Sequence, residues 1–206
     1  MCVMSYIAGL VRGVTVLDNI MYVVCSDSST ILLYNTDTYS PLDVVINVTG
    51  IKRPSDVVVC RDDRQLYVAD DDSNYHCIWR VSADDHSDQE KWLPTTDKCH
   101  VFTLSMTSRR LLVTSLQDPP GLHEYSTTDR KLLRVVPLSW CRYLHHGVET
   151  TRGTFVISHR GTALDKEPYA VSELIRLCDV LIISITISLF WKKTGNQLTL
   201  LHIINK

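Results

Sequence analysis

The densest cluster of potential metal ligands in this 206-residue chain is Asp70-Asp71-Asp72, which is followed by Asn74. Calcium binds about six to eight oxygen ligands, and side chains at this spacing supply roughly half of them. Aspartate and asparagine are equally typical of solvated turns, where their side chains bond to backbone groups. We adopt the solvated turn as the interpretation and assign no metal and no cofactor to these residues.

Histidines provide the second set of candidate ligands. His145-His146 precede a predicted strand, and with His159 and Asp27 they would offer nitrogen and oxygen to a metal. Adjacent side chains on an extended chain point to opposite sides, so a given site receives only one histidine of the pair. The turn Asp84-Asp85-His86 offers the same ligand types. We expect all these residues to be ordinary surface or core residues.

Sequence motifs of common catalytic sites are missing. The chain contains no Gly-x-Ser-x-Gly, no His-Glu-x-x-His and no phosphate-binding glycine loop. Serine, histidine and aspartate all occur, but no spacing marks a triad. We therefore predict no catalytic residue.

The elements that must position these side chains repeat with a period of about 45 residues. Tyr22, Tyr67 and Leu112 hold equivalent places, each in the second strand of a strand–turn–strand unit. A fourth copy begins at Gly147, with Phe155 at the matching place. Each unit continues with two further strands, and four short strands at this period are typical of a β-propeller blade. The hairpin turns are predicted at 17–19, 61–65 and 107–110.

The pattern predicts an all-β, β-propeller-like fold with about three complete four-stranded blades, part of a fourth, and an atypical apolar C-terminal tail. The incomplete propeller is expected over 1–173 and the tail over 174–206. The repeats are predicted at about 10–53, 54–98, 99–143 and 144–173.

The second repeat resembles a blade of the NHL family of propellers. The segments that carry the resemblance are Pro54–Val59, Leu66–Asp70, Asn74 and Cys77–Val81. Asp56 departs from the glycine usual in the family, and the family's His-Arg pair is missing. The resemblance extends over about residues 10–160 through hydrophobic spacing. It implies an interaction module for protein or RNA, often the C-terminal part of a tripartite-motif ubiquitin ligase.

The number of blades leaves three alternatives open. Closed propellers usually have about four to eight blades, and an open stack leaves raw sheet edges. The chain is a fragment of a longer propeller, its tail supplies the missing strands, or several chains assemble. We expect a fragment.

The tail contains an uninterrupted apolar run over 180–191. A membrane-spanning helix needs about 20 apolar residues, so this run is short for one. Its alternation of isoleucine with serine and threonine favours a strand. Any membrane contact is expected only through 180–191.

Charge is unevenly distributed. The whole chain has a net charge of −2, but residues 54–98 hold 11 acidic and 5 basic residues. This acidic excess argues against nucleic-acid binding and favours a protein partner with a basic patch.

Seven cysteines are scattered through the chain without a Cys-x-x-Cys motif. Cys25 and Cys60 end predicted strands and read as small core residues. The pattern is typical of a reducing compartment, so we expect a cytoplasmic protein.

Two function classes remain. The first is a non-catalytic propeller scaffold that binds another protein through its loops, as the NHL resemblance implies, with Asp70, Asp71, Asp72 and Asn74 as the partner-binding residues. The alternative is a calcium-dependent propeller hydrolase, lactonase-like, or a lyase. We favour the scaffold because no nucleophile or strong metal motif supports the enzyme.

Overall fold

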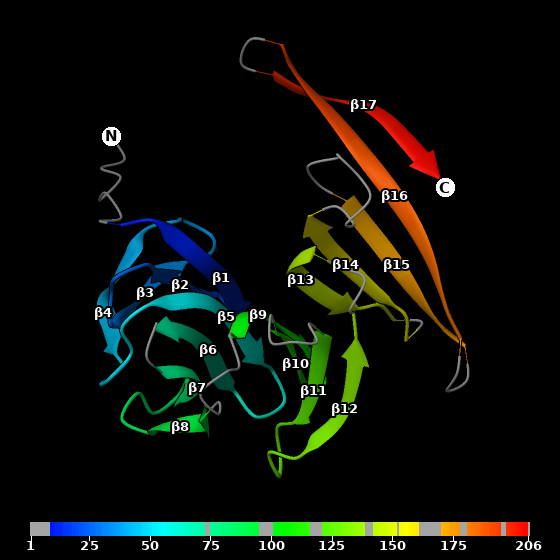
Figure 1. The fold of residues 1–206 in the computed structure, drawn as a ribbon. Coiled ribbons are helices and arrows are strands. Elements are labelled where there is room, and N and C mark those ends of the chain that lie inside the picture. The colour runs from blue at the N-terminus through cyan, green and yellow to red at the C-terminus, as the bar shows by residue number, and fades with distance from the viewer. Residues whose placement is uncertain are drawn as a thin grey trace.

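The computed structural model describes residues 9–72, 75–94, 101–115, 121–138, 142–151, 153–160, 170–177, 181–194 and 197–205. Every regular element within these ranges is a β-strand, and the strands form four antiparallel sheets (Figure 1). In each sheet the strands follow one another in sequence order, as in a propeller blade. The predicted all-β, partial propeller fold is confirmed.

The first two sheets contain four strands each. The first sheet contains β1 (Val11–Leu17), β2 (Ile20–Cys25), β3 (Thr30–Asn35) and β4 (Pro41–Asn47). The second contains β5 (Pro54–Cys60), β6 (Gln65–Asp72), β7 (Tyr75–Ser82) and β8 (Gln89–Pro94).

The other two sheets follow the same order. The third contains β9 (Val101–Thr107), β10 (Arg110–Ser115), β11 (Gly121–Ser126) and β12 (Leu132–Pro137). The fourth contains β13 (Arg142–Glu149), β14 (Phe155–Arg160), β15 (Ala170–Leu177), β16 (Leu181–Thr194) and β17 (Gln197–Asn205). The first hairpin turns of the first three sheets lie where the sequence predicted them.

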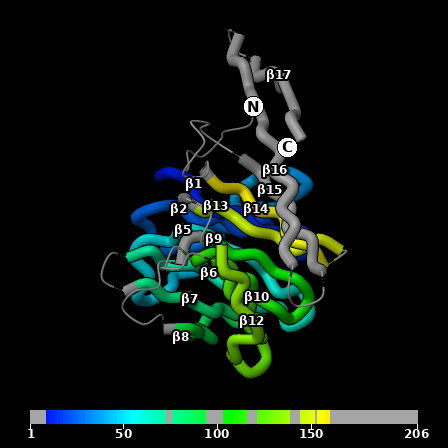
Figure 2. The backbone as a smooth tube through the Cα atoms, turned by 45° about the vertical axis from the view of Figure 1, so that its right-hand side comes forward, coloured from blue at the N-terminus to red at the C-terminus, as the bar shows by residue number. Residues whose placement is uncertain are grey.

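The four sheets fan out from a centre formed by their first strands, β1, β5, β9 and β13 (Figures 1 and 2). β1 and β5 approach so closely that a Cβ on Gly13 would lie 2.6 Å from the backbone nitrogen of Val57. Only glycine fits there without displacing a strand. A register irregularity lies near the beginning of β1, β5 and β13 in their pairing with the second strand, and such bulges increase the local twist.

Successive sheets pack face to face through apolar side chains. We call the face of a sheet that meets the next sheet along the chain its trailing face, and the face that meets the preceding sheet its leading face. Tyr22 on the trailing face of the first sheet packs in one cluster with Val57 and Val68 of the second. Tyr67 repeats this contact with Leu104 of the third sheet. Because each tyrosine makes the same contact with the next sheet, the two tyrosines lie one repeat of 45 residues apart.

Phe155 corrects one part of the repeat alignment. Tyr22, Tyr67 and Leu112 all belong to trailing faces, but Phe155 packs on the third sheet, from the leading face of the fourth. Val156, which is paired with Val148, holds the place equivalent to Tyr22. Side chains alternate between the faces of a strand, so a shift of one residue moves a side chain to the opposite face.

The tail extends the fourth sheet instead of standing apart from it. β15 runs across the predicted boundary between residues 173 and 174 and pairs with β14, and β16 pairs with β15. The tail is still atypical, because β16 has 14 residues and β17 adds a fifth strand. Val180 lies outside the described residues, whereas the rest of the predicted apolar strand falls within β16. A membrane-crossing helix is not found among the described residues.

Candidate functional site

The aspartates predicted to form a binding loop lie on a strand. Asp70, Asp71 and Asp72 are the last three residues of β6 and pair with β7, so the prediction of a loop at these positions was wrong. Asp70 is 2% exposed and Asp72 is 8% exposed. Asn74 lies outside the described residues. The β6 ladder extends to Asp72 because β7 begins at Tyr75 and matches it residue for residue.

Asp70 holds the connection between the first two sheets. Its carboxylate accepts hydrogen bonds from the backbone nitrogen of Arg53 at 2.8 Å and from that of Lys52 at 3.2 Å. The Lys52 Nζ is 2.9 Å from Asp72 Oδ2. The two bonds to Asp70 satisfy backbone donors of the segment that precedes β5. Asp70 and Asp72 therefore position the chain between the sheets.

Asp71 has a partly exposed side chain. Its Oδ1 is 2.9 Å from Nδ1 of His76, and 28% of the Asp71 side chain is exposed. Within the described residues, no three His, Cys, Asp or Glu side chains are grouped to hold a metal ion, so the candidate metal ligands do not converge there. The described residues therefore give no geometric support for a calcium site at Asp70–Asp72.

A second cluster of charges gathers at the opposite end of the first two sheets, where the hairpin turns lie. Arg64 links three turns, because its Nη1 is 2.7 Å from Asp18 Oδ2 and its Nε is 2.8 Å from Asp84 Oδ2. The hydrogen bond from Arg64 lowers the pKa of Asp84, so this carboxylate is ionised at neutral pH. We call this surface the acidic turn end. Its six carboxylates are Asp18, Asp62, Asp63, Asp84, Asp85 and Asp88.

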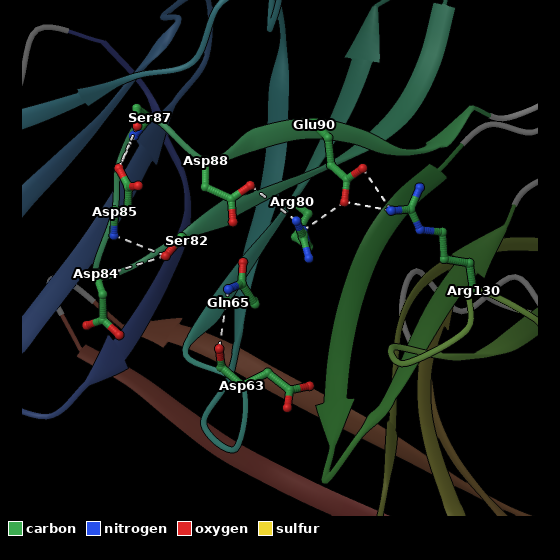
Figure 3. Close-up of polar contacts among 10 residues, drawn as sticks. All are labelled: Asp63, Gln65, Arg80, Ser82, Asp84, Asp85, Ser87, Asp88, Glu90 and Arg130. Atoms are coloured by element: carbon green, nitrogen blue, oxygen red, sulfur yellow. Dashed lines mark hydrogen bonds and ion pairs between the residues drawn. The ribbon is translucent and has the colours of Figure 1, made fainter.

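The acidic turn end is held in place by local hydrogen bonds (Figure 3). Ser82 Oγ accepts from the backbone nitrogen of Asp85 at 3.1 Å, and Asp85 Oδ1 accepts from the Ser87 hydroxyl at 2.6 Å. These bonds form side-chain turns that fix the β7–β8 connection. The carboxylates are consequently displayed on an ordered turn, with Asp84 60% exposed and Asp88 49% exposed.

An ion-pair chain continues from this end toward the third sheet. Arg80 lies 3.2 Å from Asp88 and 2.9 Å from Glu90, and Arg130 of the third sheet lies 2.7 Å from Glu90 (Figure 3). Each pair is partly exposed, so each contributes little stability by itself. The chain mainly fixes the arrangement of charge across the boundary between the second and third sheets.

A groove of about 490 Å³ lies along the first strands of the sheets. Its apolar lining includes Val14, Val58 and Met106, and its polar lining includes Asp56 and His146. The groove is thus lined by residues of the first strands of all four sheets.

Asp56 is a functional candidate that sequence reasoning noted only as a departure from glycine. Its Oδ2 accepts a 2.8 Å hydrogen bond from the backbone nitrogen of Leu104, and its Oδ1 accepts one from Val57. Burial raises the pKa of this carboxyl, while the hydrogen bonds from Leu104 and Val57 and the nearby His146 act in the opposite direction. Asp56 therefore joins β5 to β9, two strands that do not pair with each other.

Residues 52–81 match the NHL repeat family. The second blade is therefore similar to an NHL repeat. The resemblance seen in the sequence is confirmed for this blade, and β5, β6 and β7 are the strands that the NHL repeat contains. Among curated proteins, none matches this sequence.

Three solved structures are similar in fold to this chain. Kuenenia stuttgartiensis hydrazine synthase has a TM-score of 0.65 at 12% identity, over 86% of this chain and 54% of that one. A chain of a nidogen/laminin complex has a TM-score of 0.62 at 14% sequence identity, over 94% of this chain and 72% of that one. The computationally designed Ika4 protein has a TM-score of 0.55 at 9% sequence identity, over 81% of this chain and 92% of that one. At these identities the likeness is one of fold alone, and the chain spans about half of the hydrazine synthase chain.

Proposed function

We propose that this protein is a non-catalytic propeller scaffold that binds another protein through the acidic turn end. The observation that carries the proposal is the convergence of Asp18 and Asp84, from two turns, on Arg64, which lies in a third turn within the residues that match the NHL repeat. The nidogen/laminin neighbour is a protein complex, and its likeness in fold supports a scaffold of this kind.

The partner chemistry follows from the charge of this end. Asp62, Asp84 and Asp88 have side chains that are 53%, 60% and 49% exposed. Exposed carboxylates of this kind attract a partner with a basic patch and mainly raise the association rate, in a salt-dependent way. Partner binding through Asp71 and Asn74, as predicted from the sequence, remains a second proposal. Asp70 and Asp72 are buried and are not part of it.

We further propose a cytoplasmic location. Cys25, Cys60 and Cys77 are buried free thiols, which supports a reducing compartment.

The test compares two sets of substitutions that each remove three negative charges. The first set changes Asp62, Asp85 and Asp88 of the acidic turn end to Asn. The second changes Asp27, Asp43 and Asp71, which lie outside it, to Asn. Proteins captured by the wild-type chain at low salt are identified and then measured against both variants at low and raised salt.

We expect the first set to slow association and to remove its salt dependence, and the second set to leave both unchanged. Loss of binding only in the second set would assign the partner to the other end of the sheet. Calcium-dependent hydrolysis of a lactone or ester panel by the wild-type chain would overturn the non-catalytic part of the proposal.

A further inference from the structure

The central groove reaches the acidic turn end. Of its lining residues, Val16, Val59 and Met106 are each the last but one of their strand, and Arg61 lies in the turn between β5 and β6. The carboxylates of the acidic turn end begin one residue further on, at Asp62 in the same turn. A partner bound at the acidic turn end therefore faces one end of the groove.

The walls of the groove are apolar and accessible to solvent. Val14 is 49% exposed, and Val16, Val58 and Met106 are partly exposed. From Val14 to Val16 the wall formed by β1 rises by two residues, which is roughly 7 Å of strand. A groove of this depth and lining suits the apolar four-carbon stem of a lysine side chain.

Asp56 supplies a carboxylate at the inner end of this wall. A Cβ on Gly13, the residue before Val14, would lie 2.9 Å from Asp56 Oδ1, so the carboxylate is at the end of the groove farther from the turns. Its two oxygens accept one backbone hydrogen bond each, from Val57 and Leu104. A carboxylate has about four acceptor positions, so about two remain for a ligand. Burial raises the pKa of this carboxyl, and a cation bound beside it would oppose that shift.

Two further polar side chains line the groove. His146 of β13 is partly buried, and within the described part of the chain its imidazole has no hydrogen bond, so its nitrogens are available to a ligand. The guanidinium of Arg61 is bonded elsewhere, because its Nη2 donates to the carbonyl oxygen of Val16 at 3.1 Å, beside the turn end. The inner end of the groove therefore combines the carboxylate of Asp56 with an imidazole.

We propose that the groove binds one lysine side chain of the basic partner, with its stem along Val14 and Val58 and its ammonium on the carboxylate of Asp56. The inference rests on the proposed function for the source of the lysine. A primary ammonium has three donors, which the two remaining positions of Asp56 and one nitrogen of His146 can accept. Arginine presents five donors in a rigid planar fork, more than these acceptors satisfy.

The test is an NMR titration of the full chain with acetyl-Gly-Lys-Gly-amide, a probe that carries one lysine and no charged terminus. The reporters are the backbone amides of Val57 and Leu104, because both donate to Asp56. We expect saturable shifts of both amides with this probe, weaker binding of the arginine analogue, and no shifts with the norleucine analogue, which keeps the stem and lacks the ammonium. Absence of saturable shifts with the lysine probe overturns the proposal, as does equal binding of either analogue.

Two variants test the groove itself. Asp56→Asn removes the charge but keeps one acceptor oxygen, and it is expected to weaken the lysine probe by about tenfold or more. Val14→Phe narrows the groove from the β1 wall without removing an atom of Asp56, so it decides the question if Asp56→Asn does not fold. Asp43→Asn on the outer strand β4 is the matched control and should bind the probe as the wild type does. Circular dichroism checks that each variant keeps its strands, and unchanged binding by both groove variants overturns the proposal.

The probe also separates this inference from the proposed function. The variant with Asn at positions 62, 85 and 88 keeps Asp56 and the walls of the groove, so we expect it to bind the lysine probe as the wild type does while its association with the captured partner slows. Loss of probe binding in this variant would place the lysine at the turn end and overturn the groove site. Partner capture at the wild-type rate by this variant contradicts the proposed function, whereas the groove site stands or falls with the probe.

Discussion

Arg64 in the turn between β5 and β6 places its Nη1 2.7 Å from Oδ2 of Asp18 in the turn between β1 and β2. The same relation recurs one sheet further on, where Arg109 Nη2 lies 3.6 Å from Asp63 Oδ1. The two arginines are 45 residues apart, as are the two aspartates. The propeller period therefore places a cation of the second sheet beside an anion of the first, and a cation of the third beside an anion of the second.

Replacing Arg64 with Met is expected to lower the melting temperature slightly at neutral pH, because the side chain is exposed and its ion pairs are screened. The folded-state pKa of Asp84 is lowered from 3.8, so its stabilising contribution is present above 3.8 and is lost as the pH falls through the lowered value. The difference between wild type and variant should therefore shrink in acid. Thermal denaturation from neutral pH into this range measures it, with Arg53→Met as the control at another exposed arginine. A difference that grows in acid would contradict the assignment.

Replacing Tyr67 with Ala is expected to destabilise the protein by about 3–5 kcal/mol, the usual cost of truncating a buried aromatic residue. Tyr67 is 1% exposed, and its ring lies edge-on to Trp92 with centroids 5.0 Å apart. Tyr67→Phe removes only the hydroxyl, which hydrogen-bonds to Thr127, and should cost about 0.5–1.5 kcal/mol. Urea denaturation measures both variants. Equal effects for the two would show that ring packing is not what this residue contributes.

Replacing Asp70 with Ala is expected to cost about 1–3 kcal/mol, because it leaves the backbone nitrogens of Lys52 and Arg53 without their acceptor. Asp70→Asn keeps one acceptor oxygen and should lose less. Asp71→Ala is the neighbouring control, since its side chain is partly exposed and bonded to His76. Chemical denaturation ranks the three, and a larger loss for Asp71→Ala than for Asp70→Ala would refute a structural role for Asp70.

Glu124 anchors a charge network between the third and fourth sheets. Its side chain is 6% exposed and lies 2.7 Å from Arg110 and 2.6 Å from Arg134, while Arg110 also reaches Glu149 at 3.1 Å. Glu124→Ala removes this partner of Arg134 and leaves Arg110 paired with Glu149. It is expected to cost about 2–4 kcal/mol, less than breaking a fully buried pair, because the side chain of Arg110 is partly exposed to solvent.

The control for Glu124 is Asp129→Asn in the exposed pair with Lys131. The hydrogen bond from Lys131 helps hold the pKa of Asp129 to about 2, yet both side chains are solvated. This substitution is expected to change stability little. If both variants lower the melting temperature by a similar amount, Glu124 does not stabilise the protein more than an exposed ion pair does.

The fold was predictable because its signals are periodic and local. Each sheet pairs only strands that follow one another, so the order of strands in the sequence is their order in the sheet. Tyr22 and Tyr67 carry that period because packing between sheets selects large apolar residues at one place in each unit. Phe155 was misaligned by one residue because hydrophobicity alone does not distinguish the two faces of a strand buried on both sides.

The site was less predictable because its partners come from other segments. A run of three aspartates is polar, and local rules place it in a turn. The backbone nitrogens that bind Asp70 belong to residues 17 and 18 positions earlier, and that contact leaves no mark in the local pattern. The ion pair between Arg64 and Asp18 is visible in the sequence, because an arginine and an aspartate each recur 45 residues further on.

The strictly sequential pairing of the strands also bears on how the molecule unfolds. Each buried cluster joins at most two neighbouring sheets, so the folding free energy is approximated by a sum of sheet and nearest-neighbour interface energies, as in a linear array. The second and third sheets have two such interfaces within one chain, and the first and fourth have one. Amide hydrogen exchange should therefore be slowest in β6 and β10, with the outer sheets opening first as separate cooperative units.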